Sequence, residues 1–142
     1  MTMQKVMFMK EVNSKTIHPA IQKLLSFATS EFKVNQEYER YLKSLNRKLY
    51  SFEVEGVLVG CIGIEIINVN ECEIKHIAVS SDQRGKGIGS KMINYVNDKY
   101  PLISAETDND AVGFYRNYGF KITSLGEKYP GVERFLCKFN SK

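Results

Sequence analysis

The sequence predicts a mixed α/β (α+β) fold in which helices cover both faces of a largely antiparallel central sheet. The chain has 142 residues, is 43% apolar and contains only 10 Gly and 3 Pro, so residues 1–142 are expected to form one domain. Apolar residues recur with strand spacing in some segments and with helical spacing in others. A strand, a helix and a second strand follow one another in the middle of the chain, which is typical of a parallel pair within such a sheet.

The N-terminal third predicts one strand followed by two helices. Residues 6–9 form a short apolar run typical of a strand, and the polar residues 13–16 are placed to begin a helix. Apolar residues then recur at helical intervals in two sets, which a break at residues 33–35 separates. These sets are Ile17, Ile21, Leu24, Leu25 and Ala28, followed by Tyr38, Tyr41, Leu42 and Leu45.

The middle of the chain predicts three strands. Residues 49–54 and 57–67 are rich in β-forming side chains, and the Glu55-Gly56 pair between them predicts a tight antiparallel hairpin. A turn at residues 68–70 leads into residues 72–79, whose β-branched side chains are typical of a central strand.

The C-terminal half predicts a helix, a strand, a helix and two closing strands. A helical stripe begins at Ile88 and ends before Pro101, because Pro cannot continue a helix. Residues 102–105 then predict a short strand, and a second helical face ends at Gly119. The closing strands are expected at residues 120–125 and 133–139. The predicted order of elements is therefore βααβββαβαββ.

Composition argues against several classes of protein. No run approaches the roughly 18 apolar residues of a membrane span, and the N-terminus lacks the pattern of a signal peptide, so we expect a cytoplasmic protein without a membrane partner. Cys61, Cys72 and Cys137 are odd in number and form no C-x-x-C pair, which favours reduced thiols over a disulfide framework or a metal site. The net charge of +4 suits an anionic ligand, but without a basic run or a recognisable reading helix it does not predict a nucleic-acid partner.

Three alternating glycines follow the predicted central strand and open the next helix. Gly85, Gly87 and Gly89 leave room for backbone N–H groups to approach an anion, and a helix N-terminus favours negative charge. Arg84 and Lys86 add positive side chains. The spacing fits neither the G-x-x-x-x-G-K-[ST] loop of nucleotide-binding proteins nor the G-x-G-x-x-G dinucleotide fingerprint. The segment therefore predicts an anion-binding loop of another kind, with a plain strand-to-helix turn as the alternative.

Two motifs resemble the GCN5-related N-acetyltransferase (GNAT) superfamily. Residues 84–89 match its R/Q-x-x-G-x-G/A signature, and the preceding strand stands where the family has one. Residues 109–120 are similar to its N-x-x-A-x-x-F-Y-x-x-x-G-F segment, with one residue fewer between the Asn and the Ala. The resemblance covers the chain from about Leu49 to its end.

The resemblance implies transfer of an acetyl group from acetyl-CoA to a primary amine of a small molecule or peptide. In that family the strand backbone pairs with the pantetheine arm, and the loop amides hold the pyrophosphate; a homodimer is common. The cofactor-binding residues it implies are Ile77, Ala78, Val79, Arg84, Gly85, Lys86, Gly87, Ile88, Gly89, Ser90 and Asn109. An acyl-CoA sensor without catalytic activity is the alternative, and such a module would not need Tyr115.

Tyr115 is the candidate general acid. The resemblance places a tyrosine here to protonate the departing CoA thiolate, and the apolar helical face around it would hold it against the sheet. The alternative is a core tyrosine with a satisfied hydroxyl.

Several residues could serve as the general base that removes a proton from the amine. Glu73 is preferred because GNAT enzymes often place a base on this strand, and strand alternation is expected to put Glu73 and His76 on opposite faces. The other candidates are His76, Glu65, Glu106 and Asp108. Each also has a structural interpretation, as a solvated carboxylate or a hydrogen-bonded core histidine. For the acidic residues 106–110, capping of the following helix is preferred over binding of a cationic amine.

Overall fold

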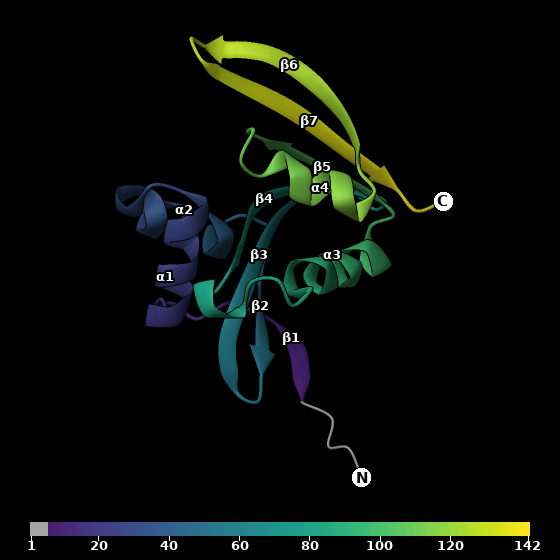
Figure 1. Cartoon of the computed structure of the whole chain (residues 1–142). Coiled ribbons are helices and arrows are strands. Elements are labelled where there is room, and N and C mark those ends of the chain that lie inside the picture. The colour runs from purple at the N-terminus through teal and green to yellow at the C-terminus, as the bar shows by residue number, and fades with distance from the viewer. Residues whose placement is uncertain (1–5) are drawn as a thin grey trace.

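The computed structural model describes residues 6–142 and follows the predicted order of strands and helices. Two short 3-10 helices, Glu31–Lys33 and Ser81–Gln83, are added to that order. The elements are β1 (Met7–Glu11), α1 (Pro19–Ala28), α2 (Val34–Lys43), β2 (Arg47–Val54), β3 (Val57–Asn68), β4 (Glu71–Val79), α3 (Ile88–Lys99), β5 (Leu102–Thr107), α4 (Val112–Tyr118), β6 (Lys121–Tyr129) and β7 (Val132–Asn140) (Figure 1).

The strands form one seven-stranded sheet in the order β1-β2-β3-β4-β5-β7-β6. Five of the six neighbouring pairs are antiparallel, and β4 with β5 is the parallel pair. β4 is therefore central, as predicted. The hairpin between β2 and β3 turns at Glu55 and Gly56, both with positive φ, which suits the right-handed twist of the two strands.

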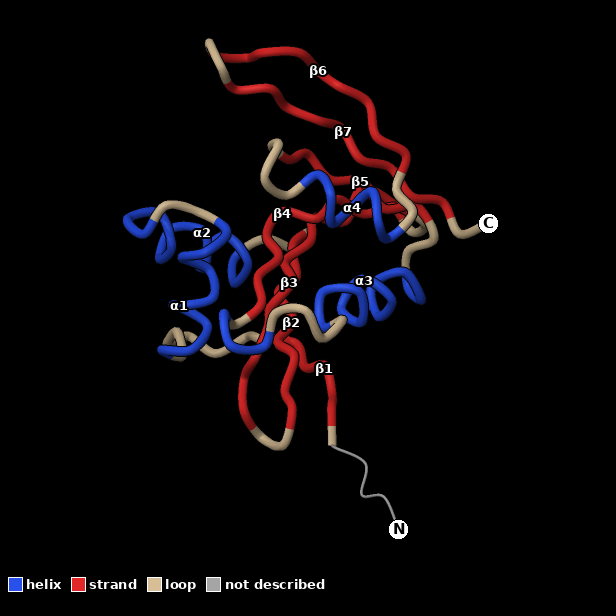
Figure 2. The backbone as a smooth tube through the Cα atoms, in the orientation of Figure 1, coloured by secondary structure: helices blue, strands red, loops and turns tan. Residues whose placement is uncertain are grey.

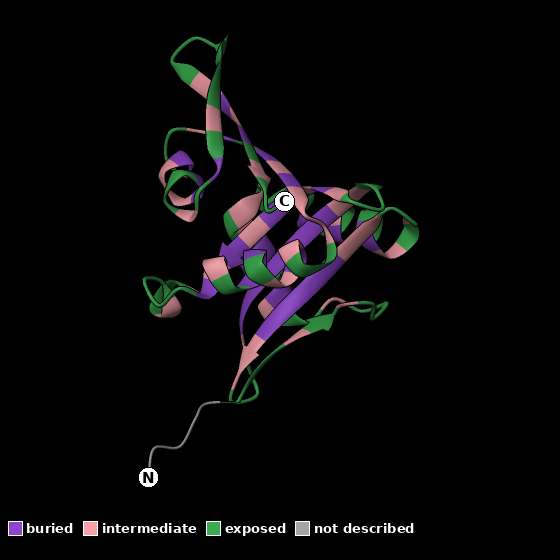
Figure 3. Cartoon of the chain, turned by 90° about the vertical axis from the view of Figure 1, so that its right-hand side faces the viewer, coloured by how far each residue is buried: buried purple, intermediate pink, exposed green. Residues whose placement is uncertain are grey.

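The sheet carries a separate hydrophobic core on each face. α1 and α2 pack on one face and α3 and α4 on the other, as predicted for helices on both faces (Figure 1). Alternation along β3 divides its side chains between the two cores, so Ile62 and Ile64 face α3 whereas Cys61 faces α1 and α2. Figure 3 shows burial concentrated in the central strands and on the inner faces of the helices.

Both N-terminal helices differ in their limits from the prediction. α1 begins at Pro19 rather than within residues 13–16, because the Ala20 N–H donates to Nδ1 of His18 at 3.0 Å and Pro19 occupies the first turn. α2 begins at Val34, which is buried, so the predicted break falls one turn too late. Leu45 follows the end of α2 and is 96% exposed.

β4 and β5 pair over only part of their length. The parallel register runs from Glu71 opposite Leu102 to Ile74 opposite Ala105, and β4 then continues to Val79 away from β5. On the other side of β4, the register with β3 shifts between Ile74 and His76, which is a β-bulge at Lys75. The separation of the two strands opens one end of the sheet beside the loop that leads to α3 (Figure 2).

The described residues contain no helix long and apolar enough to cross a membrane and no cluster of three side chains suited to hold a metal ion.

Candidate functional site

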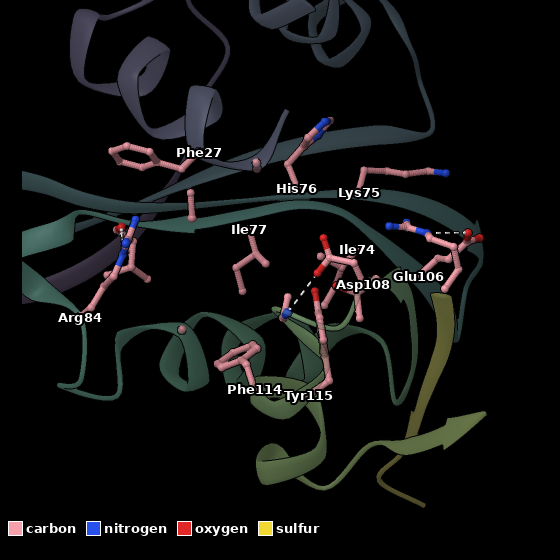
Figure 4. Close-up of a pocket in the computed structure, with 17 residues that line it drawn as sticks. Phe27, Ile74, Lys75, His76, Ile77, Arg84, Glu106, Asp108, Phe114 and Tyr115 are labelled. Carbon is pink, nitrogen blue, oxygen red and sulfur yellow. Dashed lines mark hydrogen bonds and ion pairs between the residues drawn. The ribbon is translucent and has the colours of Figure 1, made fainter. Parts of the chain in front are cut away.

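A cavity of about 470 Å³ lies where β4 separates from β5. Its walls come from β4, the end of β5, α4, the loop before α3, the end of α1 and one side chain of β7 (Figure 4). Of the predicted site residues, the cavity is lined by Ile77, Ala78, Val79, Arg84, Gly89 and Tyr115, together with the base candidates His76, Glu106 and Asp108.

The backbone of β4 turns hydrogen-bonding groups toward this cavity. The Ser80 N–H donates to the Val59 carbonyl of β3 at 2.8 Å. Because successive residues of a strand direct these groups to opposite sides, those of Ile77 and Val79 point away from β3. On that side β5 has already separated. The carbonyl of Val79 accepts from Nε of Arg84 at 3.1 Å, which confirms its direction.

The glycines of the loop before α3 have two different roles. Gly85 and Gly87 adopt φ of 80° and 77°, a left-handed conformation that other residues seldom adopt. Gly89 has an ordinary φ, but a Cβ there would lie 2.8 Å from Cε1 of Phe114. The first two glycines therefore shape the loop, and the third lets α3 lie directly against α4.

The N-terminus of α3 presents free backbone donors. Gly87 stands at the N-cap position without a side-chain cap, and its carbonyl accepts from the Lys91 N–H at 3.0 Å. The N–H groups of Ile88, Gly89 and Ser90 precede that first helical bond and have no acceptor within the helix. Arg84 stands beside them, with its guanidinium carbon 5.1 Å from the centre of the Phe27 ring. This end of the cavity is suited to an anion.

Tyr115 is buried among aromatic rings, with 5% of its surface exposed. Its ring lies 5.3 Å from that of Phe114 and 5.1 Å from that of Phe120, both edge-on. Within residues 6–142 no hydrogen-bond partner is found for the hydroxyl, and the residue lines the cavity (Figure 4). Burial raises the pKa of Tyr115 well above its usual value, so the hydroxyl stays protonated and can act as a donor.

The acidic segment before α4 contains a turn held by Asp108. Oδ1 of Asp108 accepts from the N–H groups of Asp110 at 3.0 Å and Ala111 at 3.1 Å. Asp108 thus stabilises the turn before α4, whereas the N-cap residue is Ala111 and α4 has no side-chain cap, so the predicted capping role is wrong; Asp108 also lines the cavity. Asn109 is exposed and does not line the cavity.

The expectation that Glu73 and His76 lie on opposite faces is wrong. The bulge at Lys75 adds one residue to β4, so Glu73 pairs with Glu65 and His76 pairs with Gly63 on alternate residues of β3. Both side chains consequently face α2. One inserted residue moves every later side chain of the strand to the opposite face of the sheet, and the local sequence pattern does not predict the insertion.

Charged side chains on this α2 face form a linked network. Lys75 lies 3.1 Å from Oε1 of Glu73 and 4.0 Å from Oε2 of Glu65. Nε of Arg47 donates to Glu65 at 3.1 Å, and its Nη1 lies 3.6 Å from Glu37. Arg40 lies 3.5 Å from the other oxygen of Glu37, whose Oε2 is buried and has no hydrogen-bond partner among the described residues.

His76 is buried and bonded to Tyr41. The Tyr41 hydroxyl and Nδ1 of His76 are 2.5 Å apart, and Gly63 leaves the space that this hydroxyl occupies. Burial lowers the pKa of His76, so the imidazole is neutral at physiological pH. Burial also keeps Tyr41 protonated by raising its pKa, and its O–H has no other acceptor in the described chain, so it donates to Nδ1. The remaining imidazole proton therefore resides on Nε2, which makes His76 a hydrogen-bond donor.

Glu106 is held by two cations of the β6–β7 hairpin. Its Oε1 accepts from Nζ of Lys128 at 3.1 Å and from Nε of Arg134 at 3.3 Å. These bonds lower the pKa of Glu106, chiefly through Lys128, and keep it ionised. Sequence reasoning missed Arg134 and Lys75 as lining residues, because neither belongs to a motif and the hairpin meets β5 only in the folded chain.

Comparison with known proteins shows which family the chain belongs to. A family model described as an acetyltransferase (GNAT) domain matches residues 46–122, which include β4, the glycine loop and Tyr115. The chain belongs to the GNAT acetyltransferase family. It is 36% identical over 81 residues to an uncharacterized N-acetyltransferase of the lysA 3' region of Bacillus methanolicus, a match that covers 55% of this chain and 68% of that one.

Solved structures of GNAT acetyltransferases share the fold. A family member from Elizabethkingia anophelis with acetyl-CoA bound superposes with a TM-score of 0.71 at 22% identity, covering 94% of this chain and 97% of that one. An aminoglycoside 6'-N-acetyltransferase complexed with coenzyme A gives a TM-score of 0.78 at 17% identity, covering 95% and 97%. The fold and family implied by the two sequence motifs are therefore confirmed.

Proposed function

We propose that the chain binds acetyl-CoA in the cavity between β4 and β5 and transfers its acetyl group to a primary amine. The observation that carries the proposal is the edge of β4 that β5 leaves free, where the backbone groups of Ile77 and the N–H of Val79 face the cavity while the Val79 carbonyl accepts from Arg84. An amide-containing arm such as pantetheine can pair with such an edge as an added strand. The related structures that contain acetyl-CoA or CoA support this placement.

The loop from Arg84 to Ser90 would hold the pyrophosphate. Its helix N-terminus offers N–H groups without acceptors, and the left-handed Gly85 and Gly87 direct the chain around them. Lys86 is exposed beside them and adds positive charge. Ala78 supports this arrangement from the opposite face of β4 by packing against α1 and α2.

Acetyl transfer then needs a proton acceptor for the amine and a proton donor for sulfur. The amine nitrogen attacks the thioester carbonyl carbon, the C–N bond forms, and the C–S bond breaks with its electron pair going to sulfur. Tyr115 would give its hydroxyl proton to that sulfur, and a base would take the proton lost by the amine. Glu73 is the proposed base, acting through water: it does not itself line the cavity, but Lys75, which lies 3.1 Å from it, does.

Titration calorimetry with acetyl-CoA tests the binding step on a matched pair of variants. Asn and Asp both tolerate the left-handed conformation that Gly87 adopts, and they differ chiefly in charge. We expect Gly87→Asp to weaken acetyl-CoA binding by about 100-fold or more, because like charges placed together cost several kcal/mol. Gly87→Asn should weaken it far less. Equal losses in the two variants, or no binding by the native protein, would contradict the proposal.

A further inference from the structure

The two ends of the cavity differ in the groups that they present. Arg84 stands at one end, Lys75 and Glu106 stand at the other, and Tyr115 lies between them (Figure 4). If acetyl-CoA enters along the glycine loop, as proposed above, the end near Glu106 receives the acceptor. The charges at that end therefore indicate the chemistry of the acceptor.

Two cations share one carboxylate at the acceptor end. Lys128 and Arg134 both bond to the same oxygen of Glu106, so two cations face one carboxylate. Their hydrogen bonds lower the pKa of Glu106, which fixes its single negative charge. These three side chains carry a net charge of +1, which the carboxylate of Asp108, also on the cavity wall, offsets.

The nearby carboxylates are already engaged with other groups. Glu65 and Glu73 are paired with Arg47 and Lys75. Asp108 accepts from two backbone N–H groups at the start of α4. A polycationic acceptor would need several carboxylates without cation partners, and among the described residues that line the cavity Asp108 is the one such carboxylate.

Arg134 is the cation placed to contact an acceptor. It lines the cavity, whereas Lys128 does not, and 30% of its side chain is exposed. Within the described residues only its Nε–H is engaged, by Glu106. The donors on Nη1 and Nη2 remain, and this planar pair matches the two oxygens of a carboxylate.

We infer that the acceptor is an amine that also carries a carboxylate, such as an amino acid, and that Arg134 binds this carboxylate. Glu106 is a positioning residue, because it holds the guanidinium through Nε and leaves the other edge toward the cavity. The amine would then lie on the Tyr115 side of the carboxylate. This inference rests on the proposed function and adds the substrate class.

Matched acceptors test the inference with the full chain. Lysine, β-alanine and phenylalanine are each compared with the corresponding decarboxylated amine and carboxamide in an acetylation assay. The decarboxylated amine is more basic than the amino acid and the carboxamide less basic, so a preference for the amino acid over both is not an effect of amine basicity. We expect kcat/KM to be at least about tenfold higher for at least one amino acid than for both of its partners, as for a hydrogen-bonded charge.

Three variants assign the preference to particular side chains. Arg134→Gln should raise KM for the preferred amino acid by about 10- to 100-fold and leave KM for the decarboxylated amine unchanged. Lys128→Gln is the matched control, because it removes the other cation from Glu106 without removing a cavity donor, and it should change KM by less than about threefold. Glu106→Gln should raise KM with little change in kcat, since it loosens the guanidinium only.

The outcomes separate this inference from the proposed function. Failure to bind acetyl-CoA in calorimetry would reject the proposed function and the inference together. Binding of acetyl-CoA, with equal acetylation of amines that have and lack a carboxylate, would overturn the inference alone. Acetyl-CoA binding without acetylation of any of the three amino acids would also overturn it, as would an equal rise of KM in Arg134→Gln and Lys128→Gln.

Discussion

The loop end and the acceptor end of the cavity are built in different ways. The loop end comes from one continuous segment, in which β4, three glycines and the start of α3 follow one another along the chain. The acceptor end comes from separate segments, because Glu106 at the end of β5 meets Arg134 of β7, which lies 28 residues away in sequence. The family model matches residues 46–122, which contain the glycine loop and Glu106 but not Arg134.

Under the inference above, the acceptor end is the part of the cavity that sets acceptor specificity. Backbone groups form the loop end, so it depends on a few glycines and on a helix N-terminus. Side chains from the bulge in β4, from β5 and from the projecting β6–β7 hairpin form the acceptor end (Figure 1). Substitutions in the hairpin can alter the acceptor without disturbing the loop, because the two ends share few groups.

Replacement of Tyr115, which joins the two ends, should have the largest effect. Tyr115→Phe removes the proposed acid and is expected to lower the single-turnover rate by about 100-fold or more, with acetyl-CoA affinity unchanged. Tyr118→Phe is the control, since that hydroxyl on the same helix bonds to Asn94 at 2.6 Å instead of lining the cavity. An unchanged rate in Tyr115→Phe would leave Tyr115 as a packing residue only.

Substitution of Gly89 tests whether the loop end also depends on packing between α3 and α4. Gly89→Ala should lower the free energy of unfolding by about 1–3 kcal/mol, because its Cβ would overlap the Phe114 ring. Gly113→Ala is the matched control. A Cβ at Gly113 has open space within α4, so this variant should gain about 0.4–1 kcal/mol.

Urea unfolding measures both effects. Adding Phe114→Leu to Gly89→Ala should recover part of the loss, since the smaller side chain relieves the overlap. If Gly89→Ala were as stable as the native protein, the close approach of α3 and α4 would not constrain this position.

The buried His76 on the α2 face should make stability depend on pH. Burial favours its neutral form, so its pKa in the folded chain lies below the ordinary 6.5, and the unfolded chain takes up the proton first as pH falls. The stabilisation is therefore present above pH 6.5 and is lost below it. The slope contributed by this residue cannot exceed about 1.4 kcal/mol per pH unit for one proton.

Denaturant unfolding between pH 5 and 8 checks this smallest effect. One variant replaces His76 in β4, and the control replaces His18 at the start of α1. His76→Gln should flatten the pH dependence below pH 6.5. His18→Asn should preserve it, because Asn can cap α1 as His18 does and the site is exposed. Identical slopes in His76→Gln and the native protein would show that other groups produce the pH dependence.

Local signals were sufficient for most elements and for the loop. The Glu55-Gly56 pair predicted the β2–β3 hairpin, and both residues have positive φ in the structure. Pro101 predicted the end of α3, and the alternating glycines predicted the loop. The limits of α1 and α2 were missed because His18 is an unusual cap and the 3-10 turn before Val34 carries no distinctive composition. These errors shift boundaries but leave the order of elements intact.

The position of the base candidates could not be predicted from spacing. Alternation along β4 is a sound rule until a residue is inserted, and the bulge at Lys75 arises from its pairing with β3 rather than from its own sequence. The pairing of Glu106 with Lys128 and Arg134 likewise depends on the β6–β7 hairpin lying beside β5.

The sequence by itself determined the order of elements, the family and the position of the glycine loop, because each of these depends on residues that are close together in the chain. Only the tertiary structure decided which side chains share the cavity. Strand pairing, the bulge at Lys75 and the β6–β7 hairpin bring β4, β5 and β7 together there. Contacts between distant segments depend on register and on the separation of strands, and a single inserted residue changes both.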